Sequence, residues 1–264
     1  MNLISIDDPG DPRAAAYLSI RERDLAGRQG RFVAEGKVVL EVLFSAARFE
    51  PESVLVLDKR LAGLTDTLHK APPSMPVYVA PQSVMDEIAG FHIHRGILAV
   101  ARRRHEDDAE ALIASLPPRA VVPVLVGLSN HDNVGAIFRN AAAFGANAVL
   151  LDATCCDPLY RKAIRVSVGA ALKVPFATVE SAGSLVDLLD RHGFTQIALS
   201  PAGTTDIRDA SPPHRLALYL GAEGPGLPDE LLSRLQTVRI GMAPGFDSLN
   251  VAAASAIALH RFAN

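Results

Sequence analysis

The sequence predicts an α/β protein whose second half forms a doubly wound, mostly parallel sheet. Strand-like apolar runs alternate with helix-like segments over most of the 264 residues. The run AVVPVLVGL, residues 120–128, is apolar at nearly every position, which is typical of a strand buried on both faces. In sheets of this class, ligands bind at the carboxyl ends of the strands. We therefore look for functional residues where the strands of the second half end.

The first half predicts a smaller α/β domain over residues 1–104. Residues 1–35 mix arginines with carboxylates, which favours a solvated helix surface, with a basic face toward a polyanion as the alternative. Regular alternation begins at Gly36. Helices are expected at 37–47, 60–69 and 82–89, and strands at 53–57, 76–80 and 96–101.

The predicted linker is residues 105–119, because this stretch is acidic and ends in two prolines. The second domain is expected over residues 120–264. Its strands are expected at 120–128, 146–152, 174–179, 195–200, 216–220 and 237–240. Its helices are expected at 133–144, 158–172, 185–192 and 228–235, followed by an alanine-rich helix near the C-terminus.

Composition narrows the class of protein. The chain is 49% hydrophobic and 21% charged, which is typical of a globular protein with a substantial core. The only two cysteines, Cys155 and Cys156, are adjacent and give neither a disulfide framework nor the spacing of metal ligands. A reducing, cytoplasmic compartment and no metal are therefore expected. No secretory or organellar leader and no apolar run of about 18 residues are found, so no membrane partner is expected.

Net charge does not favour a nucleic-acid partner for the chain as a whole. The formal charge is −3 and the isoelectric point is about 6.2. Binding to a polyanion would have to use local basic patches.

The first motif is NHDNVGAIFRNAAAFG, residues 130–145. Asn133 stands where an N-cap is expected. Arg139 follows on a helix face of Ala, Ile and Phe, where burying an unpaired guanidinium would be costly. Arg139 is therefore expected to face a partner charge, a phosphate or a cleft, and an ordinary surface salt bridge is the alternative.

The second motif is LGAEGPGL, residues 220–227, with three glycines directly after a predicted strand. Glycines let a ligand approach the backbone closely. The spacing is neither a dinucleotide fingerprint nor a Walker loop. A glycine-rich turn without function is the alternative. Glu223 is expected to bind a ligand, to pair with Arg139 or to be solvated.

The third motif is IGMAPGFDSLNV, residues 240–251, a loop that leads into the alanine-rich helix. Asp247 or Ser248 is expected to cap this helix. Exposed backbone before a helix N-terminus is suited to a polar ligand, with Ser248 and Asn250 as the polar side chains. A capped core helix without a ligand is the alternative.

Taken in order, the three motifs resemble those of the SpoU (TrmH-like) RNA ribose 2′-O-methyltransferases of the SPOUT superfamily, over roughly residues 120–264. The stretches GRFVAEGKVVLEVL and IAGFHIHRGILAVARR resemble that family's L30e-like RNA substrate-binding domain. The resemblance implies a trefoil knot in the C-terminal sheet, S-adenosylmethionine as methyl donor, a homodimer, and rRNA or tRNA as the partner.

The resemblance also implies roles for residues. Arg139 matches the proposed base or phosphate anchor, and because a guanidinium stays protonated we favour orientation of phosphate and ribose. Asn133 would hold the loop or the ribose, and Glu223 would position Arg139. Ser248 and Asn250 would complete the pocket. The expected cofactor-binding residues are Leu199, Ser200, Pro201, Gly221, Ile240, Met242 and Leu249.

Two positions depart from the family pattern. Gly241 stands in Ile240-Gly241-Met242 where the family has proline, which is expected to loosen the loop. Arg95 stands where the family often has glutamine and is expected to add a phosphate contact. The expected basic RNA face is Arg21, Arg23, Arg28, Arg31 and Arg102 to Arg104.

Two other functions compete with the methyltransferase interpretation. One is a non-catalytic RNA-binding protein that kept the fold, which the altered third motif would favour. The other is an unrelated α/β enzyme that binds a nucleotide at a glycine-rich loop, against which the missing fingerprints weigh.

Overall fold

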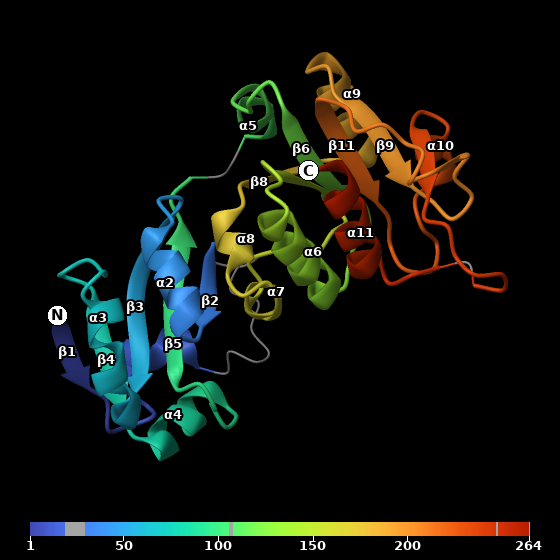
Figure 1. Cartoon of the computed structure of the whole chain (residues 1–264). Helices are drawn as coiled ribbons and strands as arrows, with labels where there is room; N and C mark the ends of the chain where they lie inside the picture. The colour runs from blue at the N-terminus through green and yellow to red at the C-terminus, as the bar shows by residue number, and fades with distance from the viewer. Residues whose placement is uncertain (19–29, 106–107, 247, 264) are drawn as a thin grey trace. The chain divides into compact units, whose positions relative to one another are not determined.

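The chain folds into two compact units, each with its own sheet (Figure 1). This computed structural model describes residues 1–18, 30–105, 108–246 and 248–263. Unit 1 consists of Met1–His105 with Leu159–Lys173, and unit 2 of Glu106–Pro158 with Val174–Asn264. The expected α/β class, with a parallel sheet in the second half, is confirmed.

Unit 1 contains a mixed five-stranded sheet in the order β1-β4-β3-β5-β2. Neighbours β1, β4 and β3 are parallel, whereas β5 pairs antiparallel with β3 and β2. The strands are β1 (Asn2–Ser5), β2 (Arg31–Glu35), β3 (Phe49–Leu57), β4 (Pro76–Ala80) and β5 (Ile97–Arg103). The helices are η1 (Pro12–Tyr17), α2 (Lys37–Ser45), η2 (Asp58–Leu64), α3 (Thr65–Leu68), α4 (Gln82–Ala89), α7 (Arg161–Val166) and α8 (Ala170–Lys173), of which η1 and η2 are 3₁₀ helices.

The solvated helix expected over residues 1–35 is wrong for the part that the structure describes. Strand β1, the short η1 and strand β2 stand there instead. Tyr17 is fully buried and shares a hydrogen bond with Ser53 Oγ over 2.7 Å, and the β2 residues Phe32 to Ala34 join the core. Burial of these few apolar residues outweighs the charge pattern around them. Arg21, Arg23 and Arg28 of the expected basic face lie outside the described residues.

Two expected helices are broken. Residues 60–69 divide into η2 and the single turn α3. Residues 158–172 divide into α7 and α8, because Val168 and Gly169 take positive φ angles of 54° and 83°. A β-branched residue rarely adopts such a backbone, so no local pattern predicts this break.

Unit 2 contains a seven-stranded sheet in the order β10-β12-β9-β11-β6-β7-β8, and every pairing in it is parallel. The strands are β6 (Ala120–Leu125), β7 (Val149–Asp152), β8 (Phe176–Val179), β9 (Thr195–Leu199), β10 (Thr205–Asp206), β11 (Arg215–Leu220) and β12 (Gln236–Arg239). The helices are α5 (Ala109–Ala114), α6 (His131–Ala143), α9 (Ala182–Arg191), α10 (Asp229–Leu232) and α11 (Val251–Phe262).

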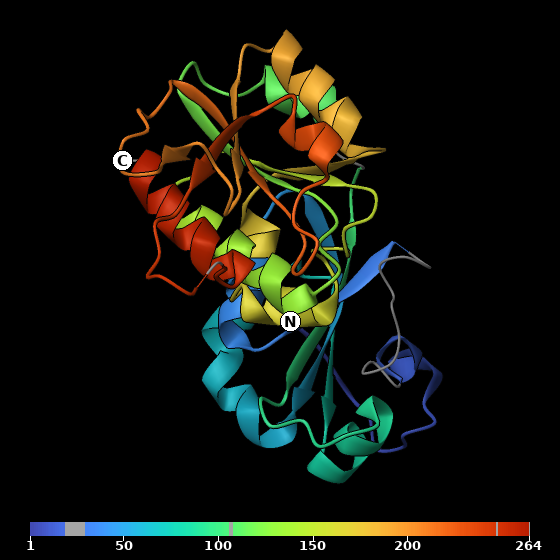
Figure 2. The same cartoon turned by 90° about the vertical axis from the view of Figure 1, so that its right-hand side faces the viewer.

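Helices cover both faces of this sheet. Leu216 and Leu218 of β11 pack in one apolar cluster with α11, and Ala217 and Tyr219 pack in another with α5, α9 and α10. Successive side chains of a strand point to opposite faces, so a strand buried on both sides reads as a continuous apolar run. On the first face α6 and α11 lie side by side (Figure 2), joined by the hydrogen bond from Asn140 Nδ2 to Ala252 O, 2.8 Å.

Both predicted helix caps are misplaced. The cap of α6 lies three residues earlier than predicted, because Asn130 Oδ1 accepts the N–H of Asp132, while Asn133 lies inside the first turn of the helix. Helix α11 is capped by Asn250 and not by Ser248, and Asp247 lies outside the described residues. The predicted helix over 228–235 is reduced to the single turn α10.

Candidate active site

A cavity of about 460 Å³ lies in unit 2 where three neighbouring strands end. The loops after β9, β11 and β12 form it together with the start of α11. Because β12, β9 and β11 are adjacent and parallel, their carboxyl ends share one edge of the sheet. Three segments that are distant in the sequence therefore meet at one place.

Every residue expected to bind the cofactor lines this cavity. They are Leu199, Ser200, Pro201, Gly221, Ile240, Met242 and Leu249. Glu223 and Ser248, expected in catalysis, line it as well. The structure thus gathers nine of the predicted residues around one space, and their contact with a cofactor stays a prediction.

The glycine-rich loop after β11 folds back on itself. Gly226 N–H donates to Ala222 O over 3.0 Å, and these two residues form an isolated antiparallel bridge. A Cβ on Gly221 would lie 2.5 Å from Gly226 C and from Leu227 N, closer than atoms can approach. Gly224 needs glycine for another reason, its φ of 87°. The loop therefore presents bare backbone to the cavity.

Asn250 connects the three motifs. Its Nδ2 donates to Asn133 Oδ1 over 2.9 Å and to Glu223 Oε1 over 2.8 Å. Its Oδ1 accepts the N–H groups of Ala252 and Ala253 at the start of α11. Asn133 is only 6% exposed, so its amide needs a partner inside the protein. One side chain thus satisfies a buried amide, a carboxylate and a helix end.

Arg139 lies apart from this cluster. It is exposed on α6, and it is not among the described residues that line the cavity. Within the described part of the chain no hydrogen bond or ion pair of its guanidinium is recorded. The partner found for Glu223 is Asn250 and not Arg139. The guanidinium is therefore available to a ligand.

Comparison with known proteins identifies the family. The family model described as "SpoU rRNA Methylase family" matches residues 120–260, more than half of the chain. A protein of Mycobacterium bovis named as an uncharacterized tRNA/rRNA methyltransferase is 39% identical over 98% of this chain and 91% of its own length. The chain belongs to the SpoU rRNA Methylase family.

Solved structures share the whole fold of this SpoU protein. A solved RNA 2′-O ribose methyltransferase is 27% identical, with a TM-score of 0.81 over 98% of this chain and 97% of its own. An AdoMet-bound rRNA methyltransferase from Sinorhizobium meliloti gives a TM-score of 0.82 at 20% identity, over 98% and 97% of the two chains. At 20% identity, the likeness to the Sinorhizobium meliloti structure shows that the two chains share a fold.

Gly241, where this SpoU sequence departs from the family proline, sits against a charged pair. A Cβ at this position would lie 2.8 Å from Asp206 Oδ2 and 3.4 Å from an Nη of Arg208. Asp206 is 9% exposed and accepts hydrogen bonds from Arg208 Nε and Nη2 over 2.9 and 3.0 Å. These bonds hold the pKa of Asp206 down, at about 2. The pair therefore occupies space that a proline ring would need.

Several residues of the site were not predicted from the sequence. Ala202 lines the cavity, and Gly203 beside it packs so close to β12 that a Cβ would lie 2.5 Å from Val238 C. Asp229 and Leu232 line the cavity beyond the glycine-rich loop. Isolated small or polar residues in loops carry no periodic signal, so only their glycine and proline neighbours mark them.

The two cysteines lie outside the cavity lining. Burial raises the pKa of Cys155 to about 12 and that of Cys156 to about 11, so both thiols are protonated at neutral pH. Among the described residues, no group of three or more histidines, cysteines or carboxylates is placed to hold a metal. None of the helices described is both long and apolar enough to pass through a bilayer.

Proposed function

We propose that this protein transfers a methyl group from S-adenosylmethionine to a ribose 2′-hydroxyl of rRNA or tRNA. The observation that carries the proposal is that the second and third motifs line one cavity, while Asn250 joins Asn133 of the first motif to Glu223 of the second. Membership of the SpoU family and the full-length likeness to an RNA 2′-O ribose methyltransferase support it. So does the fold that the chain shares with two solved methyltransferases that hold AdoMet.

The cavity fits S-adenosylmethionine in size and character. Pockets for ligands of this size span about 300–1,000 Å³ and combine apolar walls with few polar groups. Here Leu199, Ile240 and Leu249 give apolar walls, and Gly221 and Ser200 bring backbone to the surface. When bound, S-adenosylmethionine supplies an activated methyl group on a sulfonium. The chain's own task is to position the acceptor hydroxyl for attack, so that it can lose its proton as the methyl group is transferred.

Arg139 orients the RNA in this proposal. Its guanidinium stays protonated at any ordinary pH, so it is unsuited to remove a proton but suited to hold a phosphate oxygen. Asn133 and Glu223 fix Asn250, and Asn250 fixes the start of α11 beside the cavity. Ser248 adds a hydroxyl to the same wall. The hydroxyl proton leaves late in the transfer, toward the phosphate or water.

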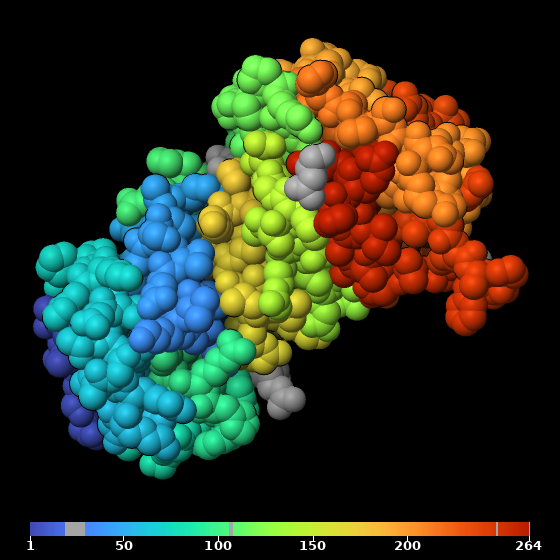
Figure 3. All heavy atoms as spheres, viewed as in Figure 1, coloured from blue at the N-terminus to red at the C-terminus, as the bar shows by residue number. Residues whose placement is uncertain are grey.

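A homodimer completes the proposed enzyme. Helices α6 and α11 reach the surface next to each other (Figure 3), and Ile257 of α11 is 41% exposed. Arg139 on α6 lines no part of its own cavity, so the proposal places it beside an RNA bound near a partner's site. Residues 1–104 would bind RNA, 105–119 would link, and 120–264 would form the knotted catalytic domain.

The proposed basic RNA face is weakened at two described positions. Arg31 Nε lies 2.9 Å from Glu52 Oε2, and Arg102 Nη2 lies 2.9 Å from Glu50 Oε2. Both guanidiniums are therefore already paired, so RNA would have to displace a carboxylate to use them fully.

Calorimetric titration with S-adenosylmethionine, with the oligomeric mass measured alongside, tests the proposal. We expect micromolar binding to a dimer, followed by 2′-O-methyl marks when rRNA and tRNA are incubated with enzyme and cofactor. Methyl groups found only on bases would contradict the ribose assignment. Absence of both binding and transfer, with RNA present and the dimer intact, would contradict the enzyme assignment.

A further inference from the structure

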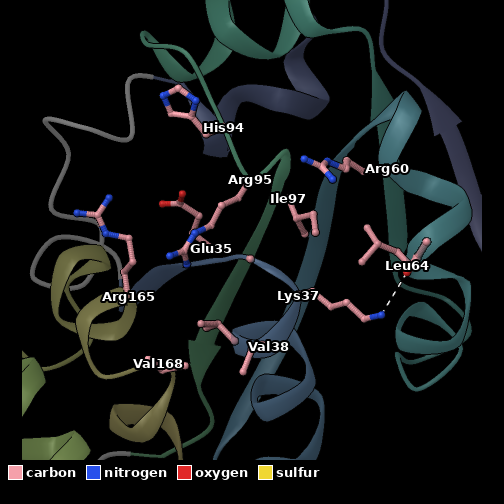
Figure 4. Close-up of a pocket in the computed structure, with 13 residues that line it drawn as sticks. Glu35, Lys37, Val38, Arg60, Leu64, His94, Arg95, Ile97, Arg165 and Val168 are labelled. Carbon is pink, nitrogen blue, oxygen red and sulfur yellow. Dashed lines mark hydrogen bonds between the residues drawn. The ribbon is translucent and has the colours of Figure 1, made fainter.

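Unit 1 contains a second cavity, of about 500 Å³, built from four separate segments (Figure 4). They are the start of α2, the helix η2, the loop before β5 and the turn between α7 and α8. The lining residues with side chains that define its character are Glu35, Lys37, Val38, Arg60, Leu64, His94, Arg95, Ile97, Arg165 and Val168.

The charge of this cavity is strongly positive and uncompensated. Lys37, Arg60, Arg95 and Arg165 contribute four cations, and Lys37 Nζ donates only to a backbone carbonyl. In the part of the chain that the structure describes, no ion pair is recorded for these four side chains. Like charges around one cavity repel one another, and an anion bound among them would relieve that repulsion.

The one carboxylate among the described lining residues does not neutralise them. Glu35 Oε2 already accepts a hydrogen bond from Arg161 Nη1 over 2.8 Å, and the Glu35 side chain is 8% exposed. Arg161 itself is not among the residues that line the cavity. Because the Glu35 carboxylate is already paired with Arg161, it leaves the positive charge of the cavity in place.

The backbone is shaped to accommodate these arginines. Gly36 has a φ of 96°, and a Cβ there would lie 3.2 Å from Arg95 Cδ. A Cβ on Gly96 would lie 2.9 Å from Leu57 Cβ and 3.2 Å from Arg60 Cγ. Val168 holds a φ of 54°, a strained conformation for a β-branched residue. Strain of this kind persists where function requires it.

Apolar surface accompanies the charge. Val38 is 55% exposed and Val168 is 40% exposed, and Leu64 and Ile97 lie with them in the lining. A nucleotide inside an RNA strand presents this combination, because its base has apolar faces and its flanking phosphates carry separate charges. Bases in a duplex are stacked and paired, so only an unpaired nucleotide reaches such a cavity.

We propose that this cavity binds one unpaired nucleotide of the RNA substrate, with its base against Val38 and Val168 and its flanking phosphates on the four cations. The proposal rests on the proposed function, because it assumes that RNA is the substrate. It assigns unit 1 a preference for single-stranded or looped RNA and supplies the contacts that Arg31 and Arg102 are too well paired to give.

Gly63 offers a clean test, because a Cβ there meets nothing within 4 Å and its φ is not in the left-handed region. Gly63→Glu places a negative charge in the cavity, and Gly63→Gln places the same shape without charge. The probe is a fluorescein-labelled decauridylate, titrated by anisotropy with the full-length chain. We expect Gly63→Glu to bind about tenfold more weakly and Gly63→Gln to bind within about twofold of the wild type.

Two further variants test the cations of the cavity, and a third controls for general electrostatics. Arg95→Gln and Arg165→Gln should each weaken binding and reduce the slope of log K against log salt by about 0.7. Arg13→Gln removes the same charge elsewhere in unit 1, where Arg13 is paired with Asp11, and should leave both quantities unchanged. Equal losses in all three variants would overturn the assignment to this cavity.

Further outcomes separate the possible ligands. Equal affinity of Gly63→Glu and Gly63→Gln for decauridylate would overturn the proposal, as would equally tight binding of a duplex of the same length. Displacement of the probe by micromolar uridine monophosphate or inorganic phosphate would overturn the proposal in favour of a small-molecule site.

Methyl transfer by the wild type is measured in parallel. If the wild type transfers methyl groups but Gly63→Glu does not change RNA binding, only this inference is refuted. If Gly63→Glu clearly weakens RNA binding but the wild type transfers no methyl group, only the proposed function is refuted.

Discussion

The side-chain amide of Asn250 donates to Asn133 Oδ1 over 2.9 Å, joining residues 117 positions apart in the chain. The same nitrogen donates to Glu223 over 2.8 Å, and the same side chain caps α11. The first turn of α6, the glycine-rich loop after β11 and the start of α11 are thus joined by a single residue. Stability and function of the site should depend on it together.

Replacing Asn250 should separate these two dependences. Asn250→Ala removes the cap of α11 and leaves the buried Asn133 amide without its donor, so we expect a loss of about 1–3 kcal/mol in the free energy of unfolding. Asn250→Asp keeps an oxygen that caps the helix but turns a donor into an acceptor beside Glu223. It should therefore lose methyl transfer while retaining more stability than Asn250→Ala. Urea unfolding and single-turnover transfer measure the two effects.

Either of two results for Asn250→Asp, one in stability and one in methyl transfer, would contradict these roles of Asn250. If Asn250→Asp were as unstable as Asn250→Ala, the cap would not be its main structural role. If Asn250→Asp transferred methyl groups at the wild-type rate, its bonds to Asn133 and Glu223 would have no part in the reaction.

Arg139 should affect transfer without affecting the cofactor. Arg139 is exposed and is not one of the described residues that line the cavity. Arg139→Ala should therefore bind S-adenosylmethionine with an affinity within about twofold of the wild type. Loss of a phosphate anchor misplaces the ribose, and misplacement of about 1 Å lowers a rate by about 100-fold. Arg139→Lys keeps the charge but not the forked geometry and should be intermediate. Calorimetry and transfer kinetics on the dimer test this, and a large loss of cofactor affinity would contradict it.

The sequence predicted the strands that form long, continuously apolar runs. It did not predict elements whose buried stretch is short or whose backbone is set by tertiary packing. Residues 120–128 and 216–220 read as strands because both faces of β6 and β11 are buried. Residues 31–35 did not, because the apolar stretch of β2 is short and stands among charges. The break at Val168 was invisible for a different reason, since tertiary packing imposes a backbone angle that valine itself disfavours.

The candidate site shows the same division. The family resemblance gave nine of the residues that line the cavity, and the glycines and polar side chains at strand ends marked two of the loops that form it. The motifs did not predict that Asn250 donates a hydrogen bond to Glu223, because hydrogen bonds between segments distant in the sequence depend on three-dimensional placement. They also gave no hint that Asp206, 35 residues before Gly241, touches that glycine in space.

Glycine should be required at position 241, because the Asp206–Arg208 pair leaves no room for a side chain there. Gly241→Ala places a Cβ 2.8 Å from Asp206 Oδ2, and relieving that overlap should destabilise the protein by about 1–3 kcal/mol and weaken S-adenosylmethionine binding. Asp206→Gly removes the obstructing carboxylate, so the double variant should lose less than the sum of the two single losses. Thermal unfolding and calorimetric titration of the four proteins give the coupling. Strict additivity would show that the contact does not matter.

Asp206 also predicts a pH dependence. Its folded pKa is about 2, held down chiefly by the hydrogen bonds from Arg208, whereas an unfolded aspartate titrates near about 3.9. A depressed folded pKa stabilises the native state above the unfolded value, and that stabilisation is lost as pH falls toward 2. The difference in urea midpoint between the wild type and Asp206→Asn should therefore be constant from pH 7 to about 5 and shrink below pH 4. Asp209→Asn, at an exposed neighbouring carboxylate, serves as the control, and a difference that stayed constant down to pH 3 would show that the carboxylate charge of Asp206 contributes nothing.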